Sequence, residues 1–85
     1  MLTPSQRYQI KKMKHKRANV LLAMTKRKCG PESVCTRKLI LFRMNRALHE
    51  RFQIERIDDL PESQFDEYLQ AIKSYGFYYG NIYIG

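Results

Sequence analysis

The sequence predicts an all-α fold: a three-helix, hairpin-like bundle of two long helices and one shorter helix, with a short extended aromatic tail at the C-terminus. Apolar residues recur at helical spacing in three segments, which are separated by a Gly-Pro step and by a loop around a Leu-Pro step. The last nine residues are instead rich in aromatic and β-branched side chains, which favour an extended strand. A chain of 85 residues has room for one core, so we expect a single domain, 1–85.

The first helix is predicted to begin after Thr3. The Thr3 hydroxyl and Gln6 can form a capping box, and Pro4 suits the first helical position. Gly30-Pro31 stops the helix, with Gly30 expected as a left-handed cap. About 25 residues at 1.5 Å each give a helix of about 38 Å, which is longer than one small core covers. We expect this helix to be partly exposed or to pair with a similar helix.

The second helix is predicted from Glu32 to about Phe52. Its inner stripe is expected to consist of Val34, Leu41, Leu48 and Phe52. Residues 39–42 are four consecutive apolar residues, which point in all directions around a helix. One face of this run can lie in the core, so the opposite face needs a partner, most simply a second subunit.

The third helix follows a loop over residues 57–63 and is expected to end at Gly76. Its inner face comprises Phe65, Leu69 and Ile72, while acidic residues in its first turns suit the positive end of the helix dipole. The tail, residues 77–85, is too apolar to be left in solvent. It should be buried on its own core or on a partner.

Charge is divided unequally along the chain. Residues 1–51 carry 14 basic and 2 acidic residues, whereas residues 52–85 carry 2 basic and 6 acidic residues, so the halves are +12 and −4. A basic half is typical of nucleic-acid binding, but it also suits an acidic protein partner or a solvated helix face. The Gly30-Pro31 turn could suggest a helix-turn-helix, but the predicted helices on its two sides are too long for that compact motif. The candidate contacts are Lys11, Lys12, Lys14, Lys16, Arg17, Lys26, Arg27 and Lys28.

The apolar residues give a second set of candidates. Tyr and Phe side chains can stack on bases, but they are more often core residues or anchors of protein interfaces. We therefore predict an interface with a partner or a second copy. Its anchors are Leu39, Phe42, Phe77, Tyr78, Tyr79, Ile82 and Tyr83.

Nothing in the sequence singles out a catalytic site. Cys29 and Cys35 are expected to be free thiols packed at helix ends, and together with His15 and His49 they match no zinc pattern, so no metal and no cofactor is predicted. The two histidines are expected at the surface. No apolar run approaches the ~18 residues of a membrane span, and no signal-peptide block is present, which predicts a cytoplasmic protein without membrane contact.

Three stretches resemble the C-terminal domain of phage antirepressor proteins. Residues 2–17 resemble its beginning, residues 41–52 its central helix, and residues 59–67 its loop and closing helix. The most specific part is the Arg-Phe step at 51–52 followed by Leu60-Pro61-x-x-x-Phe65-Asp66. The family often has Gly or Asn after the Arg-Phe step, where this chain has Gln53, and the tail after Gly76 has no counterpart.

The resemblance, which covers about residues 2–75, implies a small standalone antirepressor of a temperate phage. Such a protein binds the phage repressor directly and removes it from operator DNA, which promotes lytic induction in the bacterial host cytoplasm. The family carries over no catalytic residues, so we do not expect an enzyme. We expect a homo-oligomer, a dimer or a tetramer. The alternative is a DNA-binding transcriptional regulator that uses the basic N-terminal half.

Overall fold

In a computed structural model, which describes all 85 residues, the chain forms three helices and a C-terminal β-hairpin. Helix α1 spans Pro4–Cys29, α2 spans Arg37–Phe52 and α3 spans Phe65–Ser74. Two short 3-10 turns, η1 (Ile57–Asp59) and η2 (Glu62–Gln64), connect α2 to α3. The predicted bundle of two longer helices and one shorter helix, with an extended tail, is confirmed.

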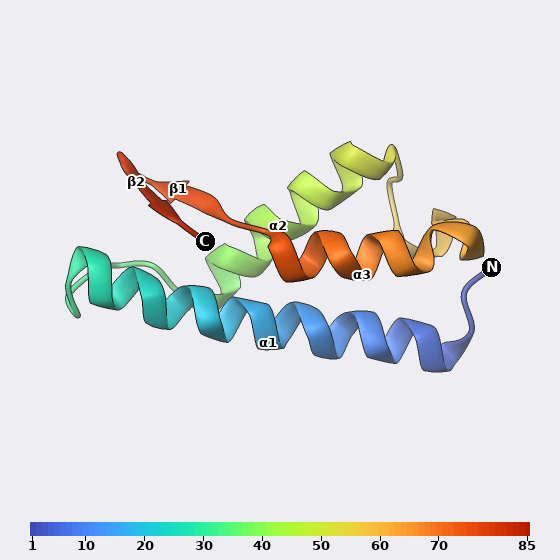
Figure 1. Cartoon of the computed structure of the whole chain (residues 1–85), viewed down its shortest axis with the longest axis horizontal. Helices are drawn as coiled ribbons and strands as arrows, with labels where there is room; N and C mark the ends of the chain where they lie inside the picture. The colour runs from blue at the N-terminus through green and yellow to red at the C-terminus, as the bar shows by residue number, and fades with distance from the viewer.

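The helices lie alongside one another with alternating direction (Figure 1). Helix α1 runs along the full length of the molecule, α2 returns obliquely, and α3 runs beside α1 in the same direction as α1. The hairpin lies over the C-terminal part of α1, at the end opposite to the N-terminus. This arrangement gives an elongated molecule of 41 × 22 × 17 Å.

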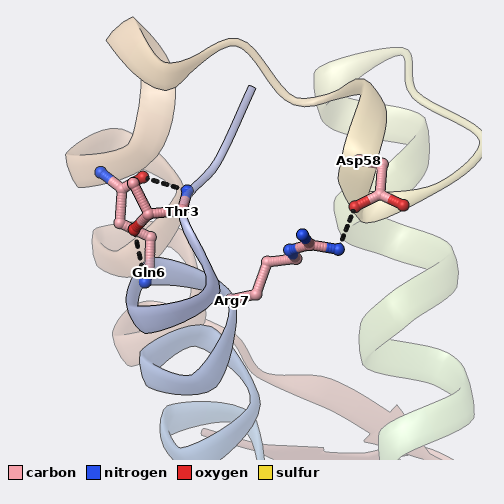
Figure 2. A network of polar contacts seen from close by, with 4 residues as sticks. All are labelled: Thr3, Gln6, Arg7 and Asp58. Carbon is pink, nitrogen blue, oxygen red and sulfur yellow. Dashed lines mark hydrogen bonds and ion pairs between the residues drawn. The ribbon is translucent and has the colours of Figure 1, made fainter.

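The start of α1 is the capping box that the sequence predicts (Figure 2). The Thr3 hydroxyl accepts a hydrogen bond from the Gln6 backbone N–H at 3.1 Å, and the Thr3 N–H donates to Gln6 Oε1 at 2.9 Å. The cap at the other end differs from the prediction. Gly30 has a positive φ of 94°, but its ψ of 153° lies far from the left-handed helical region. Glycine is still required there because of the positive φ.

The inner face of α1 is covered along most of its length. Its buried residues run from Ile10 through Ala18 and Leu21 to Thr25. Helices α2 and α3 cover the first part, and strand β2 (Ile82–Ile84) of the hairpin extends the cover toward the C-terminal end. A helix longer than a small helical core is thus accommodated within one chain, because the tail folds back on it.

The predicted start of α2 is wrong by five residues. The helix begins at Arg37 rather than Glu32, because Thr36 is extended and its hydroxyl accepts a hydrogen bond from the Leu39 N–H at 3.2 Å. Val34 therefore lies outside the helix and is 84% exposed, which contradicts its place on the inner stripe. The extended connection instead buries the neighbouring Cys35.

The core lies where the three helices meet. Helix α2 contributes Ile40, Met44 and Leu48, and α3 contributes Tyr68 and Ile72, all of them buried. The inner stripe of α2 thus runs at 40, 44 and 48, while the predicted Leu41 and Phe52 lie at its half-buried edge. Of the inner residues predicted for α3, Leu69 and Ile72 are buried and Phe65 is half-buried.

Helix α2 ends at the position where the resembled family often has Gly or Asn. Gln53 has φ 54° and ψ 48°, the left-handed conformation, and the N–H of the buried Ile54 donates to the His49 carbonyl at 3.0 Å. A side chain in this conformation costs roughly 1–2 kcal/mol, which glycine avoids. The departure at Gln53 is therefore a tolerated strain at a helix cap.

Candidate interaction surface

The C-terminal hairpin depends on the alternation of inward and outward side chains along its strands and on a glycine in its turn. Strand β1 (Phe77–Tyr79) pairs antiparallel with β2 (Ile82–Ile84), so that Phe77 lies opposite Ile84. Gly80 supplies the positive φ, 64°, that a two-residue hairpin turn needs. Since successive residues of a strand point to opposite faces, Phe77 and Ile84 enter the core while Tyr78 points outward.

The outer face of the hairpin is a pair of tyrosines. Tyr78 and Tyr83 lie opposite each other in the two strands, with ring centroids 5.2 Å apart in an edge-to-face arrangement. The Tyr83 ring packs on the backbone of Gly76, where a Cβ would lie 2.8 Å from the Ile84 carbonyl oxygen. The absence of a side chain at 76 thus lets the tail fold back and fixes the position of Tyr83.

Three cationic side chains donate hydrogen bonds to carbonyl oxygens of the chain that follows α3. Arg17 of α1 donates twice to the Tyr75 carbonyl, at 3.0 and 2.8 Å, where α3 ends. Arg43 of α2 donates to the Tyr78 carbonyl at 2.8 Å, and Lys28 donates to that of Tyr83 at 3.2 Å. These three basic side chains are therefore engaged in hydrogen bonds within the molecule.

The outer face of α2 also carries an exposed aromatic residue. Phe42 is 63% exposed, as is Tyr78, and the adjacent Arg43 places its guanidinium 5.8 Å from the Phe77 ring centroid. Because Arg43 binds both the ring of residue 77 and the carbonyl of residue 78, this turn of α2 lies beside β1. The sequence-based expectation of an apolar outer face on α2 is met by Phe42.

The seven predicted anchors fall into three groups. Phe77 is buried in the core, and Leu39 and Tyr79 are half-buried and pack against the core. The remaining four are exposed: Ile82 lies on the same face of the hairpin as Ile84, and the other three are called the aromatic surface, which consists of Phe42, Tyr78 and Tyr83.

The eight predicted basic contacts also divide. Lys14 and Arg17 are half-buried, and Lys28 is exposed but bonded to the tail. The other five side chains are exposed on α1: Lys11, Lys12, Lys16, Lys26 and Arg27. Helix α1 contains no acidic residue, and the one ion pair of the molecule joins Arg7 to Asp58 at 2.9 Å (Figure 2). Most of the positive charge is thus not neutralised within the chain.

A hollow between α1 and α2 contains polar residues that the sequence did not point out. It has a volume of about 360 Å³, and Arg7, His15 and Asn45 line it together with Lys11 and Lys14. A signal was present, since residues 7, 11, 14 and 15 share one side of a helix, as do residues 41 and 45. Recognising it would have required knowing that these two sides face each other.

The histidines and cysteines do not form a site together. Both histidines are half-buried, and burial together with the Lys14 charge lowers the pKa of His49. Cys29 and Cys35 are free, and burial raises the pKa of the Cys35 thiol. No three His, Cys, Asp or Glu side chains are grouped in a way that could hold a metal ion.

No protein-family model, curated protein or solved structure matches this chain. None of its helices combines the length and apolar composition needed to cross a membrane. The likeness to phage antirepressors therefore depends on the residues given above, and the function that it implies stays a prediction.

Proposed function

We propose that this protein is a phage antirepressor, which binds the phage repressor directly and removes it from operator DNA in the host cytoplasm. The observation that carries the proposal is the aromatic surface. Phe42 and Tyr78 are each 63% exposed, although hydrogen bonds from Arg17 and Arg43 hold this part of the chain in place. Exposed aromatic side chains on a fixed frame are typical anchors of protein interfaces.

The charge around the aromatic surface specifies the chemistry of the partner. Lys28 of α1 and Arg43 of α2 contact the hairpin that carries it, and neither has an acidic partner within the chain. A repressor face with an apolar centre and an acidic rim would complement both features. In the free protein, a second copy can cover the same apolar side chains, which gives the proposed dimer or tetramer.

The mechanism is mass action. A ligand that prefers free repressor lowers the DNA-bound fraction, and a shift from 99:1 to 1:99 needs a preference of about 5.5 kcal/mol. An interface of standard size, roughly 1,600 Å² in total, can supply that preference. No covalent step is required, and no residue is assigned a catalytic role.

The test is a binding measurement with the purified repressor of the same phage. Light scattering after size-exclusion chromatography gives the mass of the protein alone and of the mixture, and anisotropy follows the release of labelled operator. We expect Phe42→Ser and Tyr78→Ser to weaken the complex by roughly tenfold or more each. Tyr8→Ser is the matched control, because Tyr8 is 61% exposed on α1 outside the aromatic surface.

The proposal fails if the two variants bind and release repressor as the wild type does. Deleting residues 77–85 would be a poorer test, because it also removes Phe77 and Ile84 from the core. The state of the free protein is read from the same chromatography, and a strict monomer would overturn the proposed self-association alone.

A second candidate function is a DNA-binding regulator, which the basic composition of α1 favours. Its nine Lys and Arg residues have no acidic counterpart within the helix, and six of the eight predicted contacts are exposed. Anisotropy with duplex DNA at several salt concentrations separates the two functions. Tight, sequence-selective binding with a steep salt dependence would favour DNA and contradict the antirepressor proposal.

A further inference from the structure

The hollow between α1 and α2 has an unusual lining for the surface of a small protein. Arg7, Lys11, Lys14 and His15 line it from α1, and Asn45 lines it from α2. In Figure 2, Arg7 reaches from α1 toward η1. No acidic side chain lines the hollow, although its volume of about 360 Å³ falls in the range of small-molecule sites.

Lys14 is the least satisfied of these groups. Its ammonium nitrogen is 5.1 Å from the centroid of the Tyr68 ring, and it has neither a carboxylate partner nor a hydrogen-bond acceptor. Burial lowers its pKa from 10.5 to about 8, so the side chain is still protonated at pH 7. A half-buried cation without a counter-ion is costly for the fold, and a bound anion would remove that cost.

Asn45 contributes a side-chain amide to the lining of the hollow. Its Oδ1 is buried and has no hydrogen-bond partner. An oxygen of this kind accepts and would need a donor, so it does not bind an anion. The N–H₂ group of the same amide is a donor, and it is the part of Asn45 that an anion in the hollow can use.

The charge balance indicates the kind of anion. Asp58 neutralises Arg7 through the ion pair at 2.9 Å, which leaves Lys11 and Lys14 as two uncompensated charges. A phosphate group carries about −1.5 to −2 at pH 7 and has several acceptor oxygens, whereas a carboxylate carries only one charge. The lining therefore fits a phosphate better than an acetate-like group.

We propose that this hollow is a binding site for a phosphate dianion, either free inorganic phosphate or the terminal phosphate of a small monoester. Lys14 and Lys11 supply the balancing charge, and Arg7 and Asn45 supply further N–H donors. Leu41 and Ile57 are apolar parts of the lining that an ester group would contact. The site is separate from the aromatic surface, so this inference does not depend on the proposed function.

The test is a titration of the ¹⁵N-labelled protein at pH 7 and fixed ionic strength, with four probes: inorganic phosphate, phenyl phosphate, dimethyl phosphate and acetate. We expect the two dianions to shift the Asn45 side-chain amide saturably, and dimethyl phosphate and acetate to bind at least about tenfold more weakly. Tighter binding of phenyl phosphate than of inorganic phosphate assigns the site to a monoester. The reverse order assigns it to free phosphate.

Variants locate the site. Lys14→Met and Lys11→Met should each weaken phosphate binding roughly tenfold, whereas Lys26→Met should leave it unchanged. Lys26 is a matched control because it is an exposed lysine of α1 outside the hollow. An equal loss in Lys26→Met, an absence of saturation, or equal binding of dimethyl phosphate would each overturn the proposal, the last pointing instead to nucleic-acid phosphodiesters.

Discussion

Two neighbouring regions on the inner side of α1 differ in whether they provide a hydrogen-bond acceptor for a half-buried cationic side chain. Around Arg17, the guanidinium donates two hydrogen bonds to the Tyr75 carbonyl, where α3 ends. Around Lys14, one turn earlier, the ammonium has the Tyr68 ring beside it and no oxygen acceptor. Both side chains are half-buried, so the difference lies in what the rest of the chain offers them.

The comparison shows where a small helical protein finds acceptors for buried cations. The last carbonyls of a helix lack partners within the helix and carry the negative end of its dipole, so Arg17 meets a natural acceptor. The middle of α3, where Tyr68 lies, has its carbonyls already bonded within the helix. The charge of Lys14 is therefore compensated only by a ligand or removed by loss of a proton, whereas the hydrogen bonds of Arg17 stabilise the fold.

The largest effect expected from this comparison is at Arg17. Arg17→Met removes two charge-assisted hydrogen bonds and leaves the Tyr75 carbonyl without its donor, which should lower the free energy of unfolding by about 3 kcal/mol. Urea unfolding followed by circular dichroism measures this change. Lys16→Met, at the exposed neighbouring position, should change it by less than about 0.5 kcal/mol. Equal effects at 16 and 17 would show that the bonds to Tyr75 do not stabilise the fold.

Replacing Lys14, in contrast, is expected to raise the free energy of unfolding. The fall of its pKa from 10.5 to about 8 means that the unfolded chain binds more protons between those values, so stability rises as the pH increases from about 8 toward 10. The full shift corresponds to roughly 3 kcal/mol, which screening by partial exposure reduces to about 2 kcal/mol. Lys14→Met should gain this stability already at pH 7.

The pH profile of unfolding in phosphate-free buffer checks this prediction. Burial raises the pKa of Tyr68 from 10.0 to about 12, so the unfolded chain loses that proton first and stability falls again above pH 10. The groups beside Lys14 include Tyr68 of α3, His49 of α2, and Arg7, Lys11 and His15 of α1. A wild-type profile that is flat from pH 8 to 10, or a rise that persists in Lys14→Met, would contradict the assignment to Lys14.

Local rules in the sequence predicted the helices well and their meeting points poorly. The capping box at Thr3 and the apolar spacing of α3 depend on residues close in the chain, and both appear in the structure. The predicted start of α2 was wrong because residues 32–36 belong to the extended connection that buries Cys35, and the Thr36 hydroxyl caps the helix only after it. Where the helix begins depends on the packing of this connection, which no local pattern contains.

The candidate surface was predictable only in part for the same reason. The composition of the tail indicated buried aromatic residues, but the strand pairing decides that Phe77 turns inward and Tyr78 outward. Likewise, Arg17 and Lys28 looked like any other basic residue, and only the fold brings them to carbonyls 58 and 55 residues away. The hollow lined by Lys14 and Asn45 could not be predicted without knowing which sides of α1 and α2 face each other.

A smaller effect is expected at Arg43, which fastens the hairpin to α2. Arg43→Met removes one hydrogen bond of 2.8 Å to the Tyr78 carbonyl and a guanidinium 5.8 Å from the Phe77 ring centroid. Because both contacts are at an exposed position, we expect a loss of about 1 kcal/mol. Hydrogen exchange of the backbone amides in residues 77–84 should accelerate more than exchange in α1. Uniform acceleration across the chain would show that Arg43 does not act on the hairpin in particular.

The smallest expected change in the free energy of unfolding is at Lys28. Lys28 donates to the Tyr83 carbonyl at 3.2 Å from an exposed position at the end of α1, where water competes for the same oxygen. Lys28→Met should therefore change the free energy of unfolding by less than about 0.5 kcal/mol. A double variant with Arg43→Met tests whether the two bonds support one another, since both hold the same hairpin. An additive result assigns them independent roles, whereas a loss well above the sum would make the hairpin a single cooperative unit held at both of its strands.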